Sequence, residues 1–103
     1  MEVKKNKDGE NTIVSISGEI DSTNSNEFEE QIKEAIQGEP RVILDLADLE
    51  YVSSAGLRVF LMLQKLFGRG DALTIKNVNN EVMGIFKVTG FLKLLNIQNE
   101  DKG

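Results

Sequence analysis

Polar and apolar residues largely alternate near the start of the chain, in the run Thr12-Ile13-Val14-Ser15-Ile16-Ser17. A period of about two predicts a half-buried strand over residues 12–17. A weaker strand over Glu2–Lys5 precedes it, and Asp8-Gly9 is a suitable turn between the two. The chain therefore begins with a predicted pair of strands.

The period then changes to that of a helix. The helix begins either at Asn24, which has capping-box spacing to Glu27, or at Ser25. Gly38 is a natural C-cap and Pro40 prevents any continuation. Apolar positions at i, i+4, i+7 and i+8 predict one buried stripe, formed by Phe28, Ile32, Ala35 and Ile36.

Strands and helices alternate through the rest of the chain. The apolar run Val42–Leu46 predicts a central strand covered on both faces. A second helix is expected over Ser54–Phe67, closed by Gly68 and Gly70, and a further strand over Ala72–Lys76. This order predicts an α/β fold with helices packed on the sheet.

A third helix completes the predicted elements. We expect Asn80 to cap it and Gly90 to end it, with Val82, Met83, Ile85, Phe86 and Val88 as its apolar residues. Residues 91–95 are typical of a short helical turn. Ile97 is expected in a final strand or a short tail, and the residues after Asn99 are expected to be frayed.

Composition narrows the possible functions. The 103 residues suit one domain over residues 1–103, and the absence of cysteine and histidine excludes a thiolate metal site and a Ser-His-Asp triad. A net charge of −5, with no basic run, disfavours binding to nucleic acid. The N-terminus has no signal-peptide pattern, and the longest apolar run falls far below the roughly 20 residues of a membrane span. We therefore expect a cytoplasmic protein without a metal or cofactor.

The loop between the central strand and the second helix carries the most information. Ser54 is predicted as the N-cap of that helix, where free N–H groups and the helix dipole favour an anion. A phosphate on Ser54 would therefore be compatible with the fold and would add nearly two negative charges. The alternative is that Ser53 and Ser54 only cap the helix.

The run Tyr51-Val52-Ser53-Ser54-Ala55-Gly56-Leu57-Arg58 resembles the signature of anti-sigma factor antagonists of the STAS domain family, whose usual form is Asp-Ser-Ser/Thr-Gly-Leu-Gly. Three other segments resemble the same family in the same order. They are Gly18–Asp21, after the second predicted strand, Val42–Leu46, and the ending Val88–Leu95. Ser53, Ala55 and Arg58 depart from the usual signature, where the family has Asp, Ser or Thr, and Gly.

This resemblance implies a mixed four- to five-stranded β-sheet with helices packed mainly on one side. It also implies a non-enzymatic regulator whose unphosphorylated form binds an anti-sigma factor and frees the sigma factor. The anti-sigma factor or a related switch kinase would phosphorylate Ser54, with Ser53 as the second possibility, and a serine phosphatase would reverse the reaction.

The second helix and a nearby loop supply the candidate partner surface. We expect a core stripe from Ala55, Val59, Met62, Leu63 and Leu66. Spacings of i+3 and i+4 place Arg58, Leu61 or Met62, and Lys65 on a second face, which suits either a partner or a neighbouring helix. The candidate partner-binding residues are Asp21, Ser53, Ala55, Gly56, Arg58, Met62 and Lys65.

Other interpretations of these residues stay open. The resemblance implies that Asp21 helps to position the kinase nucleotide or the serine hydroxyl, but it also suits a turn-forming aspartate. Asp45 and Asp48 are a carboxylate pair, yet no other metal ligand accompanies them. A STAS-domain module of another signalling or transport complex, without phosphorylation, is the alternative function, and an enzyme is disfavoured.

Overall fold

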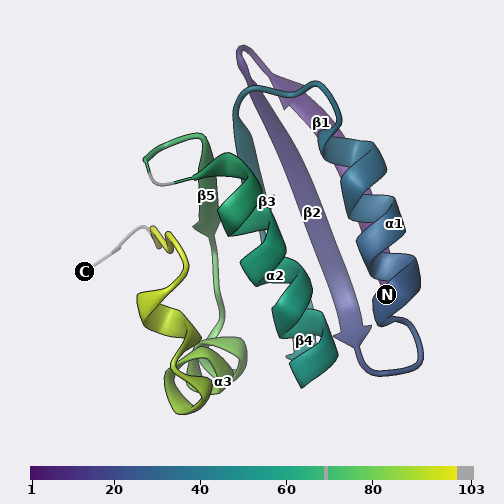
Figure 1. Cartoon of the computed structure of the whole chain (residues 1–103), viewed down its shortest axis with the longest axis vertical. Coiled ribbons are helices and arrows are strands. Elements are labelled where there is room, and N and C mark those ends of the chain that lie inside the picture. Colours follow the sequence, from purple (N-terminus) through teal and green to yellow (C-terminus); the bar gives the residue numbers. More distant parts are fainter. Residues whose placement is uncertain (69, 100–103) are drawn as a thin grey trace.

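The computed structural model describes residues 1–68 and 70–99 (Figure 1). Its strands are β1 (Glu2–Asp8), β2 (Asn11–Ile20), β3 (Val42–Asp45), β4 (Leu49–Val52) and β5 (Leu73–Lys76). Its helices are α1 (Ser25–Ile36), α2 (Ser54–Phe67), α3 (Asn80–Thr89) and a short 3-10 helix, η1 (Phe91–Lys93). Every predicted helix and strand is present, and the predicted frayed tail after Asn99 lies outside the described residues.

The sheet is mixed, as predicted. β1 pairs antiparallel with β2, and β2, β3 and β5 follow one another in parallel. In Figure 1, α1 and α2 lie side by side across one face of this sheet. The helices are therefore mainly on one side, and α3 lies beyond the end of β5, near β4.

The central strand β3 differs from its prediction. Val42 and Leu44 point into the core and are buried, whereas Ile43 and Asp45 are only partly covered. The expectation that both faces of this strand are covered is therefore wrong. Its apolar run is continuous because Ile43 lies beside Ile13 of β2 on the face away from the helices, where the two side chains shield each other.

An aromatic series joins the three helices. The ring of Phe60 on α2 lies 5.6 Å from that of Phe28 on α1 and 6.1 Å from that of Phe86 on α3, measured between centroids. All three rings are fully buried. Tilted and edge-on aromatic pairs at such distances add stability beyond burial alone, so the position of α2 depends on both neighbouring helices.

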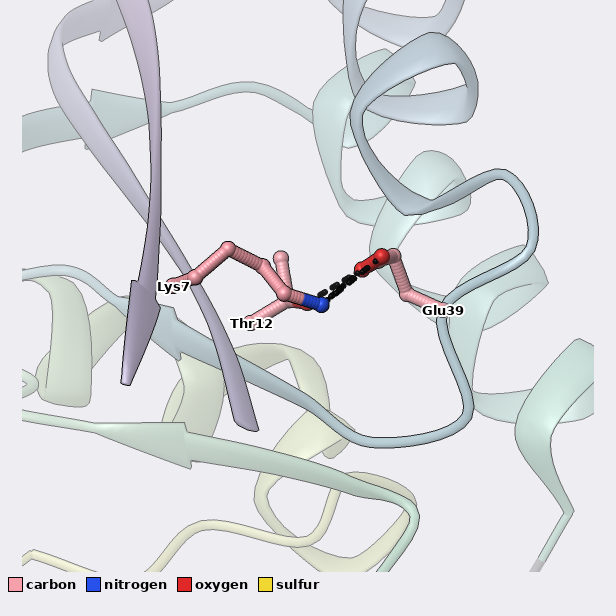
Figure 2. Close-up of polar contacts among 3 residues, drawn as sticks. All are labelled: Lys7, Thr12 and Glu39. Carbon is pink, nitrogen blue, oxygen red and sulfur yellow. Dashed lines mark hydrogen bonds and ion pairs between the residues drawn. The ribbon is translucent and has the colours of Figure 1, made fainter. Parts of the chain in front are cut away.

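A polar network joins elements at the end of the sheet opposite Ser53 and Ser54, which we call the serine loop. Figure 2 shows Lys7 of β1 and the fully buried Thr12 of β2 meeting Glu39, which follows α1. Lys7 Nζ lies 2.7 Å and 3.0 Å from the two Glu39 carboxylate oxygens and donates to Thr12 Oγ1 at 3.2 Å. The Thr12 hydroxyl in turn donates to Glu39. These hydrogen bonds lower the pKa of Glu39, Lys7 being the main cause.

Two predicted helix ends are corrected. Asn24 precedes α1, but its side chain makes no capping hydrogen bond, so the capping box does not form. The N-cap of α3 is Asn79 and not Asn80. The Asn79 side chain accepts from Val82 N at 3.0 Å and donates to the Leu49 carbonyl at 2.6 Å. Because it serves two elements, Asn79 fixes α3 to β4 as well as starting the helix.

Candidate functional site: the serine loop between β4 and α2

The end of β2 positions the candidate site. β2 pairs with β3 up to Ser15 and with β4 from Gly18 onward, and its register shifts between Gly18 and Glu19. Gly18 has a φ of 87°, a conformation that favours glycine at such an irregularity. The strand β4 was not predicted, because residues 49–52 were interpreted as part of a loop. It brings the serine loop beside the end of β2.

Ser53 follows directly from that pairing and is the N-cap of α2. Its backbone N–H donates to the Ile20 carbonyl at 2.8 Å. Its hydroxyl accepts from Gly56 N at 3.3 Å, and its carbonyl accepts from Leu57 N at 2.9 Å. The predicted cap is therefore wrong by one residue, because the extended backbone of β4 continues through Ser53.

Ser54 is the first helical residue of α2 and is exposed. Within residues 1–68 and 70–99, its hydroxyl forms no hydrogen bond. The two serines therefore differ in chemistry. The Ser53 hydroxyl accepts a hydrogen bond from the first turn of α2. The Ser54 hydroxyl lies at the surface, beside the free N–H groups of that turn.

Gly56 fixes the distance between α2 and the sheet. A Cβ at this position would lie 2.7 Å from the γ2 methyl groups of both Ile20 and Val52. Gly56 is itself buried. Its close packing holds the serine loop in position, and its role as a partner-binding residue stays a prediction.

Asp21 begins the loop after β2 and is half-buried. Its Oδ1 accepts from Thr23 N at 2.9 Å, from the Thr23 hydroxyl at 2.5 Å and from Asn24 N at 3.2 Å. These bonds, the Thr23 hydroxyl first, lower the pKa of Asp21. The turn interpretation of Asp21 is thus confirmed, while a role toward a kinase nucleotide stays a prediction.

The core face of α2 is rotated from its prediction. The buried residues are Gly56, Leu57, Val59, Phe60 and Leu63, whereas Ala55 and Met62 are half-buried and the side chain of Leu66 is 65% exposed. The contact at Gly56 sets this rotation, because it turns positions 56, 59, 60 and 63 toward the sheet.

The rotation leaves a second, outward face on α2. Arg58 and Lys65 are exposed, and together with Leu61, Met62 and Leu66 they line one shallow hollow. The predicted grouping of Arg58, Met62 and Lys65 on one face is confirmed. The binding of a partner to this face stays a prediction.

Tyr51 is a neighbour of the site that sequence reasoning missed. It lies on β4, opposite Glu19 of β2, and its side chain is 44% exposed. Exposed tyrosine beside a functional loop is typical of protein interfaces. The signal available was the strand propensity of Tyr51-Val52, which the loop interpretation did not use.

Asp45, at the end of β3, has structural partners for its carboxylate. Asp45 Oδ1 accepts from Ala47 N at 3.0 Å and from Asn77 Nδ2 at 3.1 Å, which fixes the turn after β3. In the described part of the chain, no three potential metal ligands come together. Among these same residues there is also no helix that is both long enough and apolar enough to cross a bilayer.

Comparison with known proteins identifies the class. The STAS domain family model matches residues 2–101, and the chain belongs to this family. Within the family, the curated proteins that it resembles are anti-sigma factor antagonists. The candidate antagonist BtrV of Bordetella bronchiseptica is 34% identical, over 84% of this chain and 77% of that protein. The anti-sigma F factor antagonist of Paenibacillus polymyxa is 32% identical, over 86% and 79%.

Solved structures confirm the fold. An anti-sigma factor antagonist from Mycobacterium paratuberculosis superposes with a TM-score of 0.82 at 21% identity, over 93% of this chain and 83% of that one. The predicted STAS-type sheet with helices mainly on one side is therefore confirmed by both the sequence and the structural comparison.

Proposed function

We propose that this protein is an anti-sigma factor antagonist whose binding is controlled by phosphorylation of Ser54. In its unphosphorylated form it binds an anti-sigma factor with serine kinase activity and so frees the sigma factor. The kinase transfers the γ-phosphoryl group of ATP to Ser54 Oγ, which loses its proton, and ADP leaves. A serine phosphatase restores the hydroxyl. The names of the relatives support the antagonist role.

The observation that carries this proposal is the difference between the two serine hydroxyls. Ser53 Oγ accepts the Gly56 N–H and caps α2, so a phosphate there would displace the cap. Ser54 Oγ is exposed in the first turn, where a phosphate can meet unpaired N–H groups and the positive end of the helix dipole. Modification of Ser54 therefore leaves the helix start intact.

The position of Arg58 also supports a way in which one phosphate would alter binding. Arg58 lies four residues after Ser54, on the same face of α2, and is exposed. A phosphoserine at Ser54 can pair with this guanidinium at close range. The phosphate would then both add negative charge and neutralise a cation of the outward α2 face, without any change of fold.

The test is incubation with a candidate switch kinase and ATP, followed by intact-mass and peptide mass spectrometry. We expect a single phosphate on Ser54 in the wild type and in Ser53→Ala, and none in Ser54→Ala. Phosphate on Ser53, or none with any kinase that binds the chain, would contradict the proposal. The latter result would favour the alternative of a STAS module that works without phosphorylation.

A further inference from the structure

A basic groove runs along the outward face of α2 and onto the C-terminal segment. We define it by Arg58, Leu61, Met62, Lys65, Lys93 and Leu94. Two hollows meet here: a shallow one over α2, and a groove of about 510 Å³ between α2 and η1, with Leu61 and Lys65 lining both. The surface is therefore continuous from the first turns of α2 to η1.

The charge of this groove is opposite to that of the protein. Among the described residues, three cations line it, Arg58, Lys65 and Lys93, against one carboxylate, Asp71, whereas the whole chain has a net charge of −5. None of the three cations forms an ion pair with a described residue. A concentration of unpaired cations on an otherwise acidic protein favours an acidic partner.

Apolar side chains lie between these cations. The side chain of Leu94 is 52% exposed, and Leu61 and Met62 are half-buried. Arg58 and Lys65 are seven residues apart, so they project from one face of α2 about 10 Å from each other along its axis. An amphipathic helix with leucines on one face and glutamates at i and i+7 beside them has the same spacing.

The walls of the groove are already fixed. Gln64 Oε1 accepts from Asn96 N at 2.9 Å, and Asn96 Nδ2 donates to the carbonyls of Gly70 at 3.1 Å and Leu73 at 3.0 Å. Ile97 forms a bridge to Ile75 of β5. Because these polar groups satisfy one another, the groove offers mainly its cations and apolar side chains, and it does not have to order itself on binding.

We infer that the basic groove binds an acidic amphipathic helix of the partner protein. The inference rests on the proposed function, since the anti-sigma factor is the partner that would carry this helix. It adds Lys93 and Leu94, at the far end of α2, to a surface that sequence reasoning confined to Arg58, Met62 and Lys65. Such a helix would contact the groove while the kinase site engages Ser54.

The experiment uses the unphosphorylated full chain, labelled with ¹⁵N, and no kinase. The probe is a synthetic peptide of about 18 residues, roughly five helical turns, with leucines on one face and glutamates beside them. A control peptide carries lysine in place of every glutamate. We expect saturable shifts at Leu61, Lys65, Lys93 and Leu94 with the acidic peptide, weakened when salt rises from about 50 mM to about 300 mM.

Matched variants make the test specific. Lys93→Glu should weaken binding of the acidic peptide roughly fivefold to tenfold, because it replaces attraction by repulsion. Lys5→Glu, the same change on the exposed strand β1, should alter it by less than about twofold. The spectrum of each variant without peptide shows whether the fold is retained.

Three results would overturn the inference. They are equal effects of the two lysine variants, equal binding of the basic control peptide, and absence of shifts in the groove at saturating acidic peptide. Shifts that depend on protein concentration without peptide would instead identify a second copy of this chain as the occupant. A missing phosphate on Ser54 would contradict the proposed function alone, since this experiment includes no phosphorylation.

Discussion

The backbone N–H of Ser53 donates a hydrogen bond of 2.8 Å to the carbonyl of Ile20, which joins the last residue of β2 to the first residue of the serine loop. Ile20 is fully buried, and its γ2 methyl group also limits the space beside Gly56. One core residue therefore fixes both the start of α2 and its distance from the sheet, and the position of Ser54 follows from packing.

Replacing Gly56 by alanine should destabilise the protein, by about 1–3 kcal/mol, because the new methyl group would overlap two branched core side chains. Urea denaturation measures this change. Gly84→Ala is the matched control. Gly84 also lies in a helix, but a Cβ there meets nothing within 4 Å, so that variant should be neutral or more stable by up to about 1 kcal/mol. Equal effects at the two glycines would contradict the packing explanation.

Variants of Ser53 and of Ser54 should differ in their effect on the stability of the protein. Ser53→Ala should lower the free energy of unfolding by about 0.5–2 kcal/mol, since it removes the N-cap of α2, whereas Ser54→Ala should change it by less than about 0.5 kcal/mol. Ser54→Asp should be stable, because its charge favours the helix N-terminus by roughly 0.3–1 kcal/mol. Thermal melting measures all three variants.

The Ser54 variants should also differ in their affinity for the anti-sigma partner, where alanine is expected to bind more tightly than aspartate. Ser54→Ala should bind as wild type and resist switching, and Ser54→Asp should bind more weakly, because its carboxylate neutralises Arg58 and is desolvated at the interface. Isothermal titration calorimetry gives both affinities. If Ser54→Asp kept full affinity, the phosphorylated protein, with nearly two charges at that position, would decide between a switch and an inert surface residue.

Low pH should remove the contribution of the Glu39 carboxylate to the free energy of unfolding. Its pKa is lowered from the ordinary 4.5 in the folded protein by Lys7 and Thr12, so the carboxylate stabilises the fold above that pH. This stabilisation is lost as the pH falls through the lowered, folded-state pKa. Glu39→Gln should therefore be less stable than wild type at neutral pH, and the difference should shrink toward acid.

Denaturation by urea, an uncharged denaturant that does not screen the ion pair, measures that difference at a series of pH values. Glu30→Gln is the control, because Glu30 is exposed and forms no ion pair in the described part of the chain. Asp21, whose pKa is also lowered, is present in every variant and cancels from the comparison. A gap between Glu39→Gln and wild type that stayed constant with pH would mean that the charge of Glu39 does not matter.

Asn79 and Asn80 offer a direct test of the α3 cap. Asn79→Ala should cost about 1–3 kcal/mol, since it removes the cap and also leaves the Leu49 carbonyl without its side-chain donor. Asn80→Ala, at the exposed next position, should change stability by no more than about 0.5 kcal/mol. Chemical denaturation of the pair would identify the cap, and a larger loss at Asn80 would restore the assignment made from sequence.

Hydrophobic periodicity was sufficient for most of the fold. It placed α1, α2 and β5 well because their buried positions repeat at regular intervals, as Phe28 and Ile32 do. It missed β4, because Leu49–Val52 has only four residues, and the charged Asp48 and Glu50 beside its apolar positions suited a loop. Which short segment pairs with β2 depends on a contact partner far away in the sequence, and no local pattern contains that information.

The candidate site shows the same limit. The motif pointed to the correct loop, but the assignment of the cap to Ser54 failed because either serine has a suitable side chain. Backbone conformation alone decides between them, and it is set by the bond from Ser53 to Ile20. The outward face of α2 was predicted from i+3 and i+4 spacing. Lys93 and Leu94 could not be added to this surface from sequence, because only the three-dimensional path of the C-terminal segment brings them beside α2.

The change of partner along β2 has an evolutionary consequence. Residues before Gly18 pair with β1 and β3 and determine whether the domain folds, whereas the residues after it pair with β4 and determine where the serine loop lies. The two parts of this single strand thus serve different purposes, and one glycine divides them. Of the two residues after that glycine, Ile20 belongs to the core and is constrained, whereas Glu19 is exposed and can vary beside the serine loop while the sheet is kept.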